Sequence, residues 1–493
     1  METEPRKLKI AVIGTGASGI LAVIKLRELG QNDIRVFEKA SDMGGTWRDN
    51  RYPGIACDVP SHLYRFSFEP NAEWTRTCAS GPEIWNYLRD VYERHDIGRH
   101  VIFDAEVMKA TYGEGCWTLE TRAGTFGPFD VVITAMGILR YPLYPQIEGL
   151  SDFAGPALHS ARWDPAVELD GKRVGVIGCG STGTQIIPAI IDRVQQLELF
   201  QRTPQWIMPL PNPPISEEDK ELFRADPQLM QQRYEVLAHE FNSKFAAAVV
   251  GQNDRAYARM VERCQANLEN SIADPALREK LRPDYKVGCR RLVMSDGFYD
   301  AIQKPNAAVV TEGIERIEPG GVRTGDGHLH ELDVLILATG YDAHAGLSPM
   351  KVTGKDGLDL EEAWQDGARA YLGVTVPGFP NWFMIGGPNS PIGNFSFIMT
   401  AETQMNYIAG LVEMIASGQA DAVMPKGAAM ESFYEAVNAQ MAKTIWATGC
   451  RNWYMNKKGE IASWPWTFEH FQNMMAHPQP EDFDLLAGEA VRA

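Results

Sequence analysis

The chain has 493 residues, of which 44% are hydrophobic and 23% charged, and its net charge is −17. A single core stops growing near ~250–300 residues, so this length predicts two or three domains in an ordinary globular composition. The acidic balance argues against nucleic acid or an anionic membrane surface as a main partner, because both require clustered Lys and Arg.

The first residues and the apolar runs carry no pattern for export or membrane insertion. The chain passes from a short polar stretch straight into an apolar strand, and no apolar run approaches the ~20 residues of a membrane span. We therefore expect a cytoplasmic protein. The 7 cysteines extend from Cys57 to Cys450 without a C-x-x-C pair. That spacing fits neither a disulfide framework nor a metal site, and we interpret all of them as ordinary thiols.

A dinucleotide-binding pattern begins the folded part of the chain. An apolar run rich in β-branched residues leads into Gly14-x-Gly16-x-x-Gly19 and then into a segment with helical periodicity. The first glycine makes the turn, the second lets the backbone approach a pyrophosphate, and the third lets the helix pack on the strand. Glu38 ends the next strand, where a carboxylate accepts a ribose hydroxyl. The alternative is a glycine-rich loop that binds nothing.

The same pattern recurs later, so the chain contains two such modules. Gly178, Gly180 and Gly183 have the same spacing, again between an apolar strand and a helical segment. Each module closes with an apolar strand and a turn of small residues, at 129–137 and 332–340. Two cofactors, or one cofactor and a relic site, are implied.

The two modules differ at the end of their second strands. The position that holds Glu38 in the first module holds Arg202 in the second, followed by Thr203. Arginine binds a ribose 2′-phosphate through charge-assisted hydrogen bonds, whereas a carboxylate repels it. We therefore predict FAD at the first module and NADPH at the second. Glu198, within the second strand, is the competitor and would favour NADH if it reached the ribose.

These patterns predict an α/β fold with two Rossmann-like domains. We expect a first part of an FAD domain at 1–150 and an NADPH domain at 151–340, with a helical insertion at about 209–284. Residues 341–493 are expected to return to the FAD domain and to supply active-site loops. Within them, residues 399–418 have helical periodicity, and their methionines are interpreted as core residues.

The segment between the modules resembles a family signature. Phe153-x-Gly155-x-x-x-His159-x-x-x-Trp163-Asp164 is similar to the fingerprint of type I Baeyer-Villiger monooxygenases. Flavin-containing monooxygenases have a similar segment that ends in Tyr or Phe, so Trp163 and Asp164 favour the Baeyer-Villiger branch. The resemblance implies an enzyme that uses FAD and NADPH to insert one oxygen atom from O2 beside a ketone carbonyl, which gives an ester or lactone.

Further segments are similar to the same family, including residues 44–58, 200–204, 290–291 and 338–342. The resemblance implies that Arg291 stabilises a flavin peroxide and the tetrahedral adduct, and that Asp58 pairs with Arg291. It also places Trp453 on a mobile loop that covers NADPH. The predicted cofactor contacts are Gly14, Gly16, Ala17, Ser18, Gly19, Glu38, Lys39, Gly45, Thr46, Trp47, Asp58, Val59 and Tyr64 for FAD, and Gly178, Gly180, Ser181, Thr182, Gly183, Gln185, Arg202, Thr203, Arg290, Arg291, Ala338, Thr339, Gly340 and Trp453 for NADPH.

Several alternatives stay open at this point. The pair of Asp58 and Arg291 could be purely structural. His159 is expected to orient the linker between domains rather than to act as a general base, and Trp163 and Trp453 could be packing residues. The competing functions are oxidation of amine nitrogen or sulfide sulfur, and electron transfer without oxygenation. The substrate is left open, and a monomer or a homodimer is expected.

Overall fold

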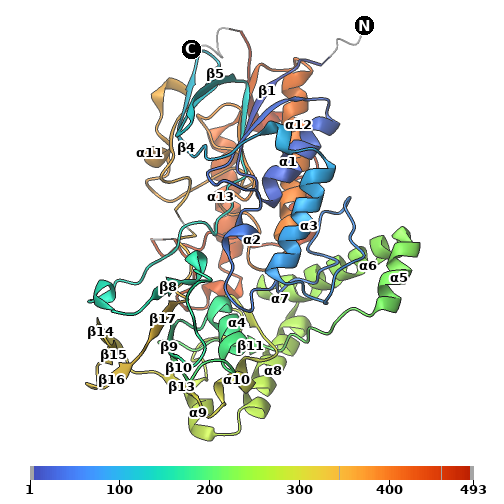
Figure 1. The fold of residues 1–493 in the computed structure, drawn as a ribbon. Helices are drawn as coiled ribbons and strands as arrows, with labels where there is room; N and C mark the ends of the chain where they lie inside the picture. Colours follow the sequence, from blue (N-terminus) through green and yellow to red (C-terminus); the bar gives the residue numbers. More distant parts are fainter. Residues whose placement is uncertain (1–4, 344, 457, 489–493) are drawn as a thin grey trace.

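Two five-stranded parallel sheets form the frame of the computed structural model, which describes residues 5–343, 345–456 and 458–488 (Figure 1). The first sheet has the order β19-β7-β1-β2-β3. Its strands are β1 (Lys9–Ile13), β2 (Asp33–Phe37), β3 (Val101–Ile102), β7 (Val131–Thr134) and β19 (Trp382–Met384). β19 comes from late in the chain and lies beside β7, which therefore occupies an interior position in this sheet.

Helices cover one face of the first sheet and a smaller sheet covers the other. In Figure 1, α1, α3 and α12 lie together on one side of β1, and the smaller sheet lies on the other. The smaller sheet has the order β18-β4-β5-β6. Its bounds and those of the helices are α1 (Ala17–Glu28), α2 (Thr46–Asp49), α3 (Gly81–Arg94), α11 (Leu360–Ala363), α12 (Phe397–Ala416), β4 (Val107–Gly113), β5 (Cys116–Thr121), β6 (Gly124–Phe129) and β18 (Lys351–Thr353).

The second sheet forms the lower half of the molecule in Figure 1 and has the order β13-β10-β9-β17-β8. α4 and α10 pack together beside it, and an antiparallel meander shares a core cluster with it. The elements are β8 (Ala157–His159), β9 (Arg173–Ile177), β10 (Gln196–Phe200), β13 (Ala307–Val310), β17 (Val334–Leu337), α4 (Ser181–Ile190), α10 (Phe298–Ile302), β14 (Ile314–Glu318), β15 (Gly321–Thr324) and β16 (Leu329–Glu331). The two parallel sheets form the α/β architecture that the sequence predicted.

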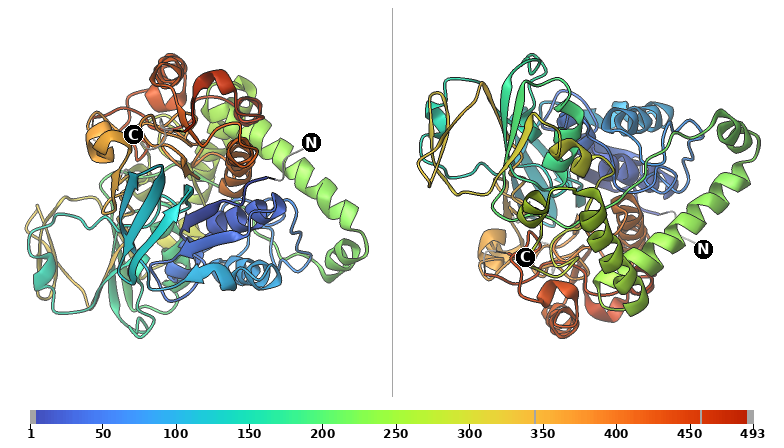
Figure 2. Two further views of the ribbon diagram at one scale, coloured as in Figure 1. Left: turned by 90° about the horizontal axis from the view of Figure 1, so that it is seen from above. Right: turned by 90° about the horizontal axis from the view of Figure 1, so that it is seen from below.

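Helices of the second half extend away from the sheets. Figure 2 shows α5 and α6 as an arm that projects from the body of the molecule. The helices of this region are α5 (Glu217–Ala225), α6 (Pro227–Glu240), a π-helical turn (Phe241–Ala246), α7 (Ala247–Val249), α8 (Asp254–Ser271) and α9 (Pro275–Lys280). Arg224 on α5 binds both carboxylate oxygens of Glu73, at 2.7 and 2.8 Å, and so holds the arm against the first domain.

The remaining elements complete the two halves. β11 (Ile207–Met208) pairs with β12 (Val293–Met294), and β20 (Ala422–Pro425) pairs with β21 (Phe483–Leu486). Two further helices, α13 (Gly427–Met441) and α14 (Phe468–Met474), belong to the last part of the chain. No helix among the described residues is both long enough and apolar enough to span a lipid bilayer.

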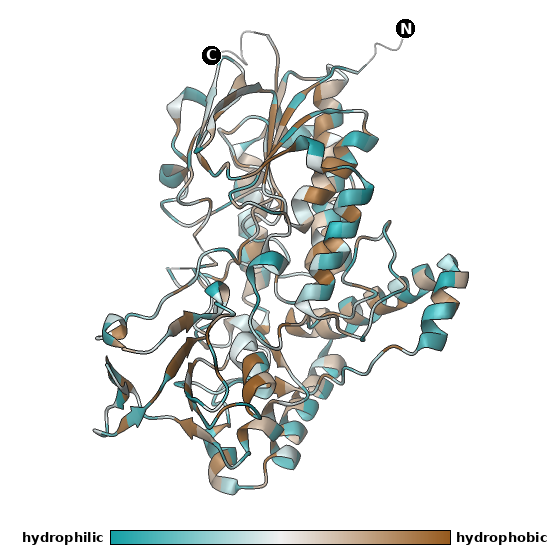
Figure 3. Cartoon of the chain, viewed as in Figure 1, coloured by the Kyte–Doolittle hydropathy of each residue, from teal (hydrophilic) through white to brown (hydrophobic). Residues whose placement is uncertain are grey.

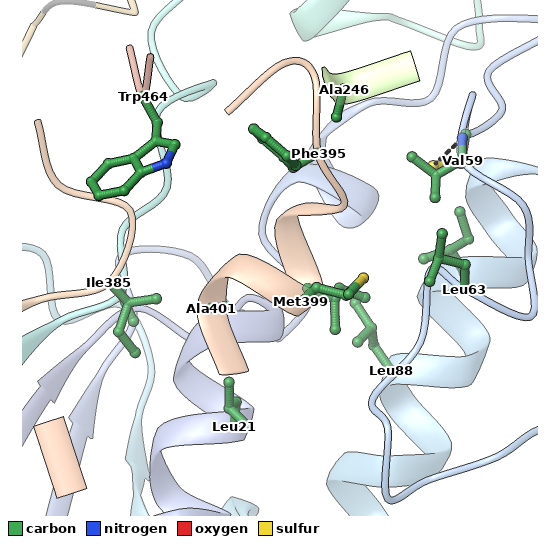
Figure 4. Packing of buried hydrophobic residues seen from close by; sticks show 14 of the residues in the cluster. Leu21, Val59, Leu63, Leu88, Ala246, Ile385, Phe395, Met399, Ala401 and Trp464 are labelled. Carbon is green, nitrogen blue, oxygen red and sulfur yellow. Dashed lines mark hydrogen bonds between the residues drawn. The ribbon is translucent and has the colours of Figure 1, made fainter. Parts of the chain in front are cut away.

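The core forms where the helices meet the sheets. The strands of both sheets are strongly hydrophobic in Figure 3, as expected for parallel strands covered on both faces. Leu21 of α1, Leu88 of α3 and Met399 of α12 come together in Figure 4, and all three are buried. Met405 of the same helix is fully buried. The prediction of a helix over 399–418 with methionines in the core is therefore confirmed.

His62 is buried where the first domain meets α5. Its ring lies 4.6 Å from that of Phe223, and neither ring nitrogen has a hydrogen-bond partner within the described part of the chain. Burial, helped by the positive charges of Arg65 and Arg233, lowers the pKa of His62 to about 4, although Asp219 opposes the shift. The folded protein therefore disfavours the protonated ring.

This histidine predicts a defined sensitivity to acid. An unfolded histidine has a pKa near 6.5, so above that pH the ring is neutral in both states and does not affect folding. Between pH 6.5 and 4 the unfolded state takes up a proton that the folded state does not, and the free energy of unfolding falls by up to about 3 kcal/mol. We expect His62→Phe to unfold at a higher temperature than wild type at pH 4.5 but not at pH 7.5. Thermal unfolding across this pH range checks this, with the exposed His477→Phe as control. Parallel pH profiles for wild type and His62→Phe would contradict it.

Candidate active site

The first glycine turn has the geometry of a nucleotide-binding loop. Gly14 has a φ of 107°, and a Cβ there would lie 2.7 Å from the carbonyl oxygen of Ala135. A Cβ on Gly19 would lie 1.9 Å from the oxygen of Gly14. Gly16 precedes α1, whose first turn contains Ala17 and the buried Ser18, and it makes no side-chain cap. The N–H groups of the first turn of α1 thus receive no capping side chain, as an anion site requires.

Glu38 is buried beside this turn at the end of β2. One of its oxygens accepts hydrogen bonds from the backbone N–H and the hydroxyl of Thr15, at 3.0 and 2.7 Å. The other oxygen accepts the N–H of Ala40 and lies 3.2 Å from Arg48. The following residue, Lys39, places its ammonium 5.1 Å from the ring centre of Tyr141 in the connection to the second domain. Glu38 is therefore fixed in position at the edge of the first glycine turn.

The segment that begins at Gly45 connects the first glycine turn to the rest of the site. Gly45, with a φ of 54°, approaches Gly16 so closely that a Cβ on it would lie 3.1 Å from the Gly16 Cα. Thr46 and Trp47 then open α2, and the Trp47 ring packs edge-on against Tyr64 at 5.6 Å. The two loops therefore pack backbone against backbone, with no side chain between them.

Val59 lies within the core below this segment, close to Leu63 in Figure 4. Its N–H donates to the Cys57 sulfur at 3.4 Å. This bond fixes the direction in which the chain leaves the buried Cys57, and so the position of Asp58 between the two residues.

The second glycine turn repeats the geometry of the first. Gly178 has a φ of 109°, and a Cβ on Gly183 would lie 2.1 Å from the Gly178 oxygen. Gly180 precedes α4 without a side-chain cap, and a Cβ added to it would meet nothing within 4 Å. Ser181 is the first residue of α4. The turn therefore holds two glycines for packing and one that faces open space.

This contrast predicts different outcomes for two alanine substitutions. Gly183→Ala forces α4 away from the Gly178 carbonyl, and we expect it to lower the free energy of unfolding by about 1–3 kcal/mol. Gly180→Ala is the matched control, because its methyl group has free space in the absence of nucleotide. Thermal unfolding without NADPH is the measurement. Equal unfolding midpoints for the two variants would contradict the assigned roles.

The basic residues predicted for a 2′-phosphate lie close to the second turn. Arg202 is exposed, and its side chain has no hydrogen bond or ion pair within the described segments. The carbonyl oxygen of Thr203 accepts a hydrogen bond from Cys179 Sγ at 3.2 Å. Arg290 lies near Cys179, its guanidinium stacks 4.8 Å from the Tyr285 ring centre, and its buried Nε has no partner in the described chain. Two guanidinium groups thus have unused donors at this turn.

Glu198, the competitor from sequence reasoning, is occupied elsewhere. It is 7% exposed, and its two oxygens bind His330 Nδ1 at 2.6 Å and the Gln196 amide at 2.7 Å. A carboxylate held in this way is not available to a ribose. The geometry therefore favours NADPH over NADH at the second turn.

Thr182 and Gln185 on α4 contact the first domain. The Gln185 amide donates to the carbonyl oxygen of Ala56 at 2.9 Å and accepts from the Tyr52 hydroxyl at 2.9 Å. Thr182 also hydrogen-bonds to Tyr52. The amide of Gln185 therefore joins the two domains. Its partners, Tyr52 and Ala56, lie shortly before Asp58 in the chain.

Asp58 and Arg291 form the ion pair that the resemblance implied. Arg291 Nη2 donates to Asp58 Oδ2 at 2.6 Å, and its Nη1 donates to the Gly393 carbonyl at 2.6 Å. The Asp58 carboxylate raises the pKa of Arg291 further above its ordinary value. The two side chains are 31% and 21% exposed, so the pair faces open space. A permanent, oriented cation lies where residues 58, 291 and 393 meet.

Sequence reasoning missed two residues beside this pair, Gly393 and Tyr454. Tyr454 is 4% exposed, burial raises the pKa of its hydroxyl to about 12, and it lies against Arg291. A Cβ on Gly393 would lie 2.6 Å from this hydroxyl and 3.1 Å from the Trp453 ring. Trp453 packs on Tyr454 with 4.6 Å between ring centres. In the sequence, the position of Tyr454 next to Trp453 was the one feature that could have pointed to Tyr454 as a site residue.

The fingerprint segment connects the two domains. Phe153 is buried in the core of the second sheet, and a Cβ on Gly155 would lie 2.3 Å from the carbonyl oxygen of Asp333. Trp163 is half-buried against the main core, and Asp164 is exposed and accepts the N–H of Ala166 at 2.9 Å. β8 lies within this segment as a short edge strand. The composition of this segment suited neither a core strand nor an amphipathic helix, and the structure has neither. The short edge strand β8 was not predicted.

His159 ends β8 and is buried at the connection between the two halves. Its Nδ1 accepts the N–H of Ala161 at 3.1 Å. Its ring lies 5.0 Å from that of Tyr144 and 6.4 Å from that of Tyr341. Burial lowers the pKa of His159. A neutral ring packed between two tyrosines suits a positioning role better than proton transfer.

The predicted Ala-Thr-Gly turn runs beside this connection. The Ala338 carbonyl lies against Gly178, and the Thr339 hydroxyl donates to the Leu143 carbonyl at 2.7 Å. Gly340 has a φ of 84°, and its carbonyl accepts the Leu143 N–H at 2.9 Å. The two crossings between the domains are therefore hydrogen-bonded to each other next to the second turn.

One expectation about cysteine is wrong. Cys289 and Cys450 form a disulfide, whereas we had interpreted all seven cysteines as thiols. The two are 161 residues apart in sequence, and such a separation gives no local pattern. The folded chain brings them to a Cα distance of 6.1 Å, within the range that a disulfide spans. Cys57, Cys78, Cys116, Cys179 and Cys264 are free thiols.

The fold and site define a protein with two dinucleotide-binding units and a partly exposed arginine–aspartate pair. Residues 7–345 match the flavin-binding monooxygenase-like family. The chain is 44% identical over 485 residues to an uncharacterized monooxygenase of Mycobacterium tuberculosis, which covers 98% of this chain and 97% of that protein. It is 39% identical over 484 residues to a Baeyer-Villiger monooxygenase of Streptomyces coelicolor, with 97% and 93% covered.

Solved structures agree with these relatives. Cyclohexanone monooxygenase from Rhodococcus sp. Phi1 bound to NADP+ superposes with a TM-score of 0.87 at 31% identity, and the match covers 98% of this chain and all of that one. Oxidized steroid monooxygenase bound to NADP gives a TM-score of 0.87 at 27% identity over the same shares. The chain therefore belongs to the flavin-binding monooxygenases and, within them, to the type I Baeyer-Villiger monooxygenases.

Proposed function

We propose that this protein is an FAD- and NADPH-dependent enzyme that converts a ketone into an ester or lactone. The overall reaction takes the ketone, O2, NADPH and a proton, and it yields the oxygenated product, NADP+ and water. The observation that carries the proposal is the Arg291 guanidinium, held by the Asp58 carboxylate and the Gly393 carbonyl. Such a fixed cation stabilises negative charge that develops on oxygen during the attack on a carbonyl.

The residues at the first turn fit FAD. The positive φ of Gly14, the uncapped start of α1 and the close approach of Gly45 to Gly16 form a cradle that a Cβ would fill. Glu38 lies at the edge of this cradle, where a ribose hydroxyl would exchange with the Thr15 hydroxyl. Bound flavin would accept a hydride from NADPH and pass its electrons to O2.

The residues at the second turn fit NADPH. Gly180 faces open space before α4, and Arg202 and Arg290 have free donors beside it. Two cations bind a 2′-phosphate, which NADH lacks. Tyr454 lies against Arg291, with Trp453 packed on Tyr454, and the two rings would exclude water there.

In this proposal each residue of the pair has a distinct task. Arg291 binds the negatively charged oxygen species and the substrate carbonyl, and it keeps its charge at every working pH. Asp58 orients the guanidinium through one hydrogen bond, while the Gly393 carbonyl fixes the other nitrogen. Loss of either acceptor would let the guanidinium rotate out of position.

The test is product analysis with purified, FAD-loaded enzyme, NADPH and a panel of cyclic, linear and aryl ketones under ¹⁸O2. We expect an ester or lactone that contains one ¹⁸O atom per molecule. A methyl aryl sulfide in the same panel separates the competing function, although some ketone-oxidising enzymes also accept sulfides. Sulfoxide formation without any ester from the whole panel would contradict the proposal. NADPH oxidation that yields only hydrogen peroxide would contradict it as well.

A further inference from the structure

The disulfide joins two segments that the proposed function uses separately. Cys289 directly precedes Arg290 and Arg291, and Cys450 lies three residues before Trp453. The bridge therefore connects the turn that carries both arginines to the loop that packs over them. Nothing in the roles assigned so far requires a covalent link at this point.

Noncovalent contacts also hold the loop to the arginine turn. The Asn452 amide donates to the Cys289 carbonyl at 3.0 Å. Trp453 and Tyr454 pack on Gly393, whose carbonyl in turn accepts Arg291 Nη1. Between the end of a short helical turn at Ala447 and Met455, no regular helix or strand supports the described loop. Beside these contacts the Tyr454 hydroxyl hydrogen-bonds to Arg291, and its ring packs 4.9 Å from that of Trp446. The disulfide is the covalent tie in this set, and the other contacts are individually weak.

The two cysteines of the bridge differ in their surroundings. Cys289 is fully buried, whereas Cys450 is 9% exposed and is flanked by the exposed residues Gly449 and Arg451. Attack at Cys450, which lies between two exposed residues, is therefore easier than attack at the enclosed Cys289, and Cys289 is the leaving group. Thiol–disulfide exchange proceeds through such an attack on one sulfur.

We propose that Cys289 and Cys450 form a redox site that controls closure of the 448–455 loop over the bound nicotinamide nucleotide. In the disulfide form, the loop is held against the arginine turn and Trp453 stays over Arg291. In the dithiol form, the loop has only its weaker contacts and opens. The existence of the redox site stands on the disulfide alone, while its effect on NADPH rests on the proposed function.

The chemistry balances with a small-molecule dithiol as reductant. Its first thiolate attacks Cys450 Sγ, the Cys289–Cys450 bond breaks, and Cys289 leaves as a thiolate and takes up a proton. The second thiol of the reductant then displaces Cys450, so that two electrons and two protons enter the protein. Hydrogen peroxide reverses the change: one thiolate cleaves the O–O bond and becomes a sulfenic acid, and the other thiol displaces water to restore the disulfide.

The loss of the bridge changes the population of the closed loop. When the binding-competent state is only a fraction of the total, the apparent dissociation constant rises by the inverse of that fraction. A loop that is closed about one tenth of the time would raise the apparent dissociation constant for NADPH about tenfold. The reactions at the flavin should change less, because Arg291 keeps its bonds to Asp58 and Gly393.

The first experiment tests the redox site without any turnover. Thiol alkylation and mass spectrometry of the full-length protein, denatured without reductant, should find 5 reactive cysteines of the 7 after mild peroxide treatment and all 7 after dithiothreitol. Hydrogen exchange of the folded protein should increase in residues 448–455 on reduction. All seven thiols free after peroxide treatment, or unchanged exchange in that loop, would overturn the proposal whatever the enzyme catalyses.

The second experiment tests the consequence for NADPH. Cys289→Ser, Cys450→Ser and the double variant should each show a KM for NADPH about three- to tenfold above that of the oxidised wild type, without further response to dithiothreitol. Reduced wild type should match them, and the half-exposed free thiol variant Cys116→Ser should behave as wild type. A lower unfolding temperature with an unchanged KM in all three variants would assign the bridge to stability alone and overturn the proposal.

Discussion

Replacing Arg291 by alanine is expected to end ketone oxygenation while NADPH can still reduce the flavin. Removal of one group that stabilises a developing oxyanion lowers rates by roughly 10²–10³. Arg291 is the group with this position, because it is held by Asp58 and the Gly393 carbonyl at 2.6 Å each. NADPH oxidation should continue and release hydrogen peroxide. Ester yield per NADPH consumed is the measurement.

Two further variants separate charge from geometry in this prediction. Arg291→Lys keeps a cation but not the forked donors, so it should recover only part of the ester yield. Removing Arg291 alone also leaves Asp58 unpaired, and the double variant Asp58→Ala/Arg291→Ala controls for that. Both alanine variants should retain FAD and unfold near the wild-type temperature, since the pair is partly exposed. Wild-type ester yield from Arg291→Ala would refute the assigned role.

The two glycine turns were predictable from the sequence because their geometry is local. Gly14 and Gly178 adopt positive φ angles, and Gly19 and Gly183 have no room for a Cβ. Each requirement falls at a set spacing between a strand and a helix, so a single chain displays it. Both sheets then follow from the apolar strands around these turns.

The constellation around Arg291 was only partly predictable. Asp58 and Arg291 were found through a family resemblance, since no spacing rule connects positions that are 233 residues apart. Gly393 contributes a backbone carbonyl, which has no sequence signature. Tyr454 reads as an ordinary aromatic until the fold places it against the guanidinium.

The cysteine error and the open question about Glu198 have the same physical origin. The disulfide joins Cys289 to a residue 161 positions later, which no local pattern can indicate. Glu198 was a plausible ribose ligand until the structure showed that His330, from another strand, binds it. Contacts between distant segments decide both cases, and a single sequence does not reveal which segments meet.

The choice of nicotinamide cofactor gives the second large effect. Arg202 and Arg290 both have unused donors at the second turn, and a hydrogen bond to a charged group is worth about 1.5–3 kcal/mol. Each alanine substitution should therefore raise the KM for NADPH about 10- to 100-fold and leave that for NADH nearly unchanged. In the double variant, the preference for NADPH should disappear.

A control of equal charge makes this result specific. Arg282→Ala also removes one positive charge from the same half of the chain, but Arg282 is engaged with Glu269 and Glu279. It should keep the wild-type preference, because its charge is already balanced by two carboxylates and it offers no unused donor to a 2′-phosphate. Steady-state kinetics with both nucleotides at several salt concentrations supply the comparison. If Arg290→Ala and Arg202→Ala weakened NADH and NADPH equally, the two arginines would bind the shared pyrophosphate instead, and the physical basis for assigning NADPH to this turn would be lost.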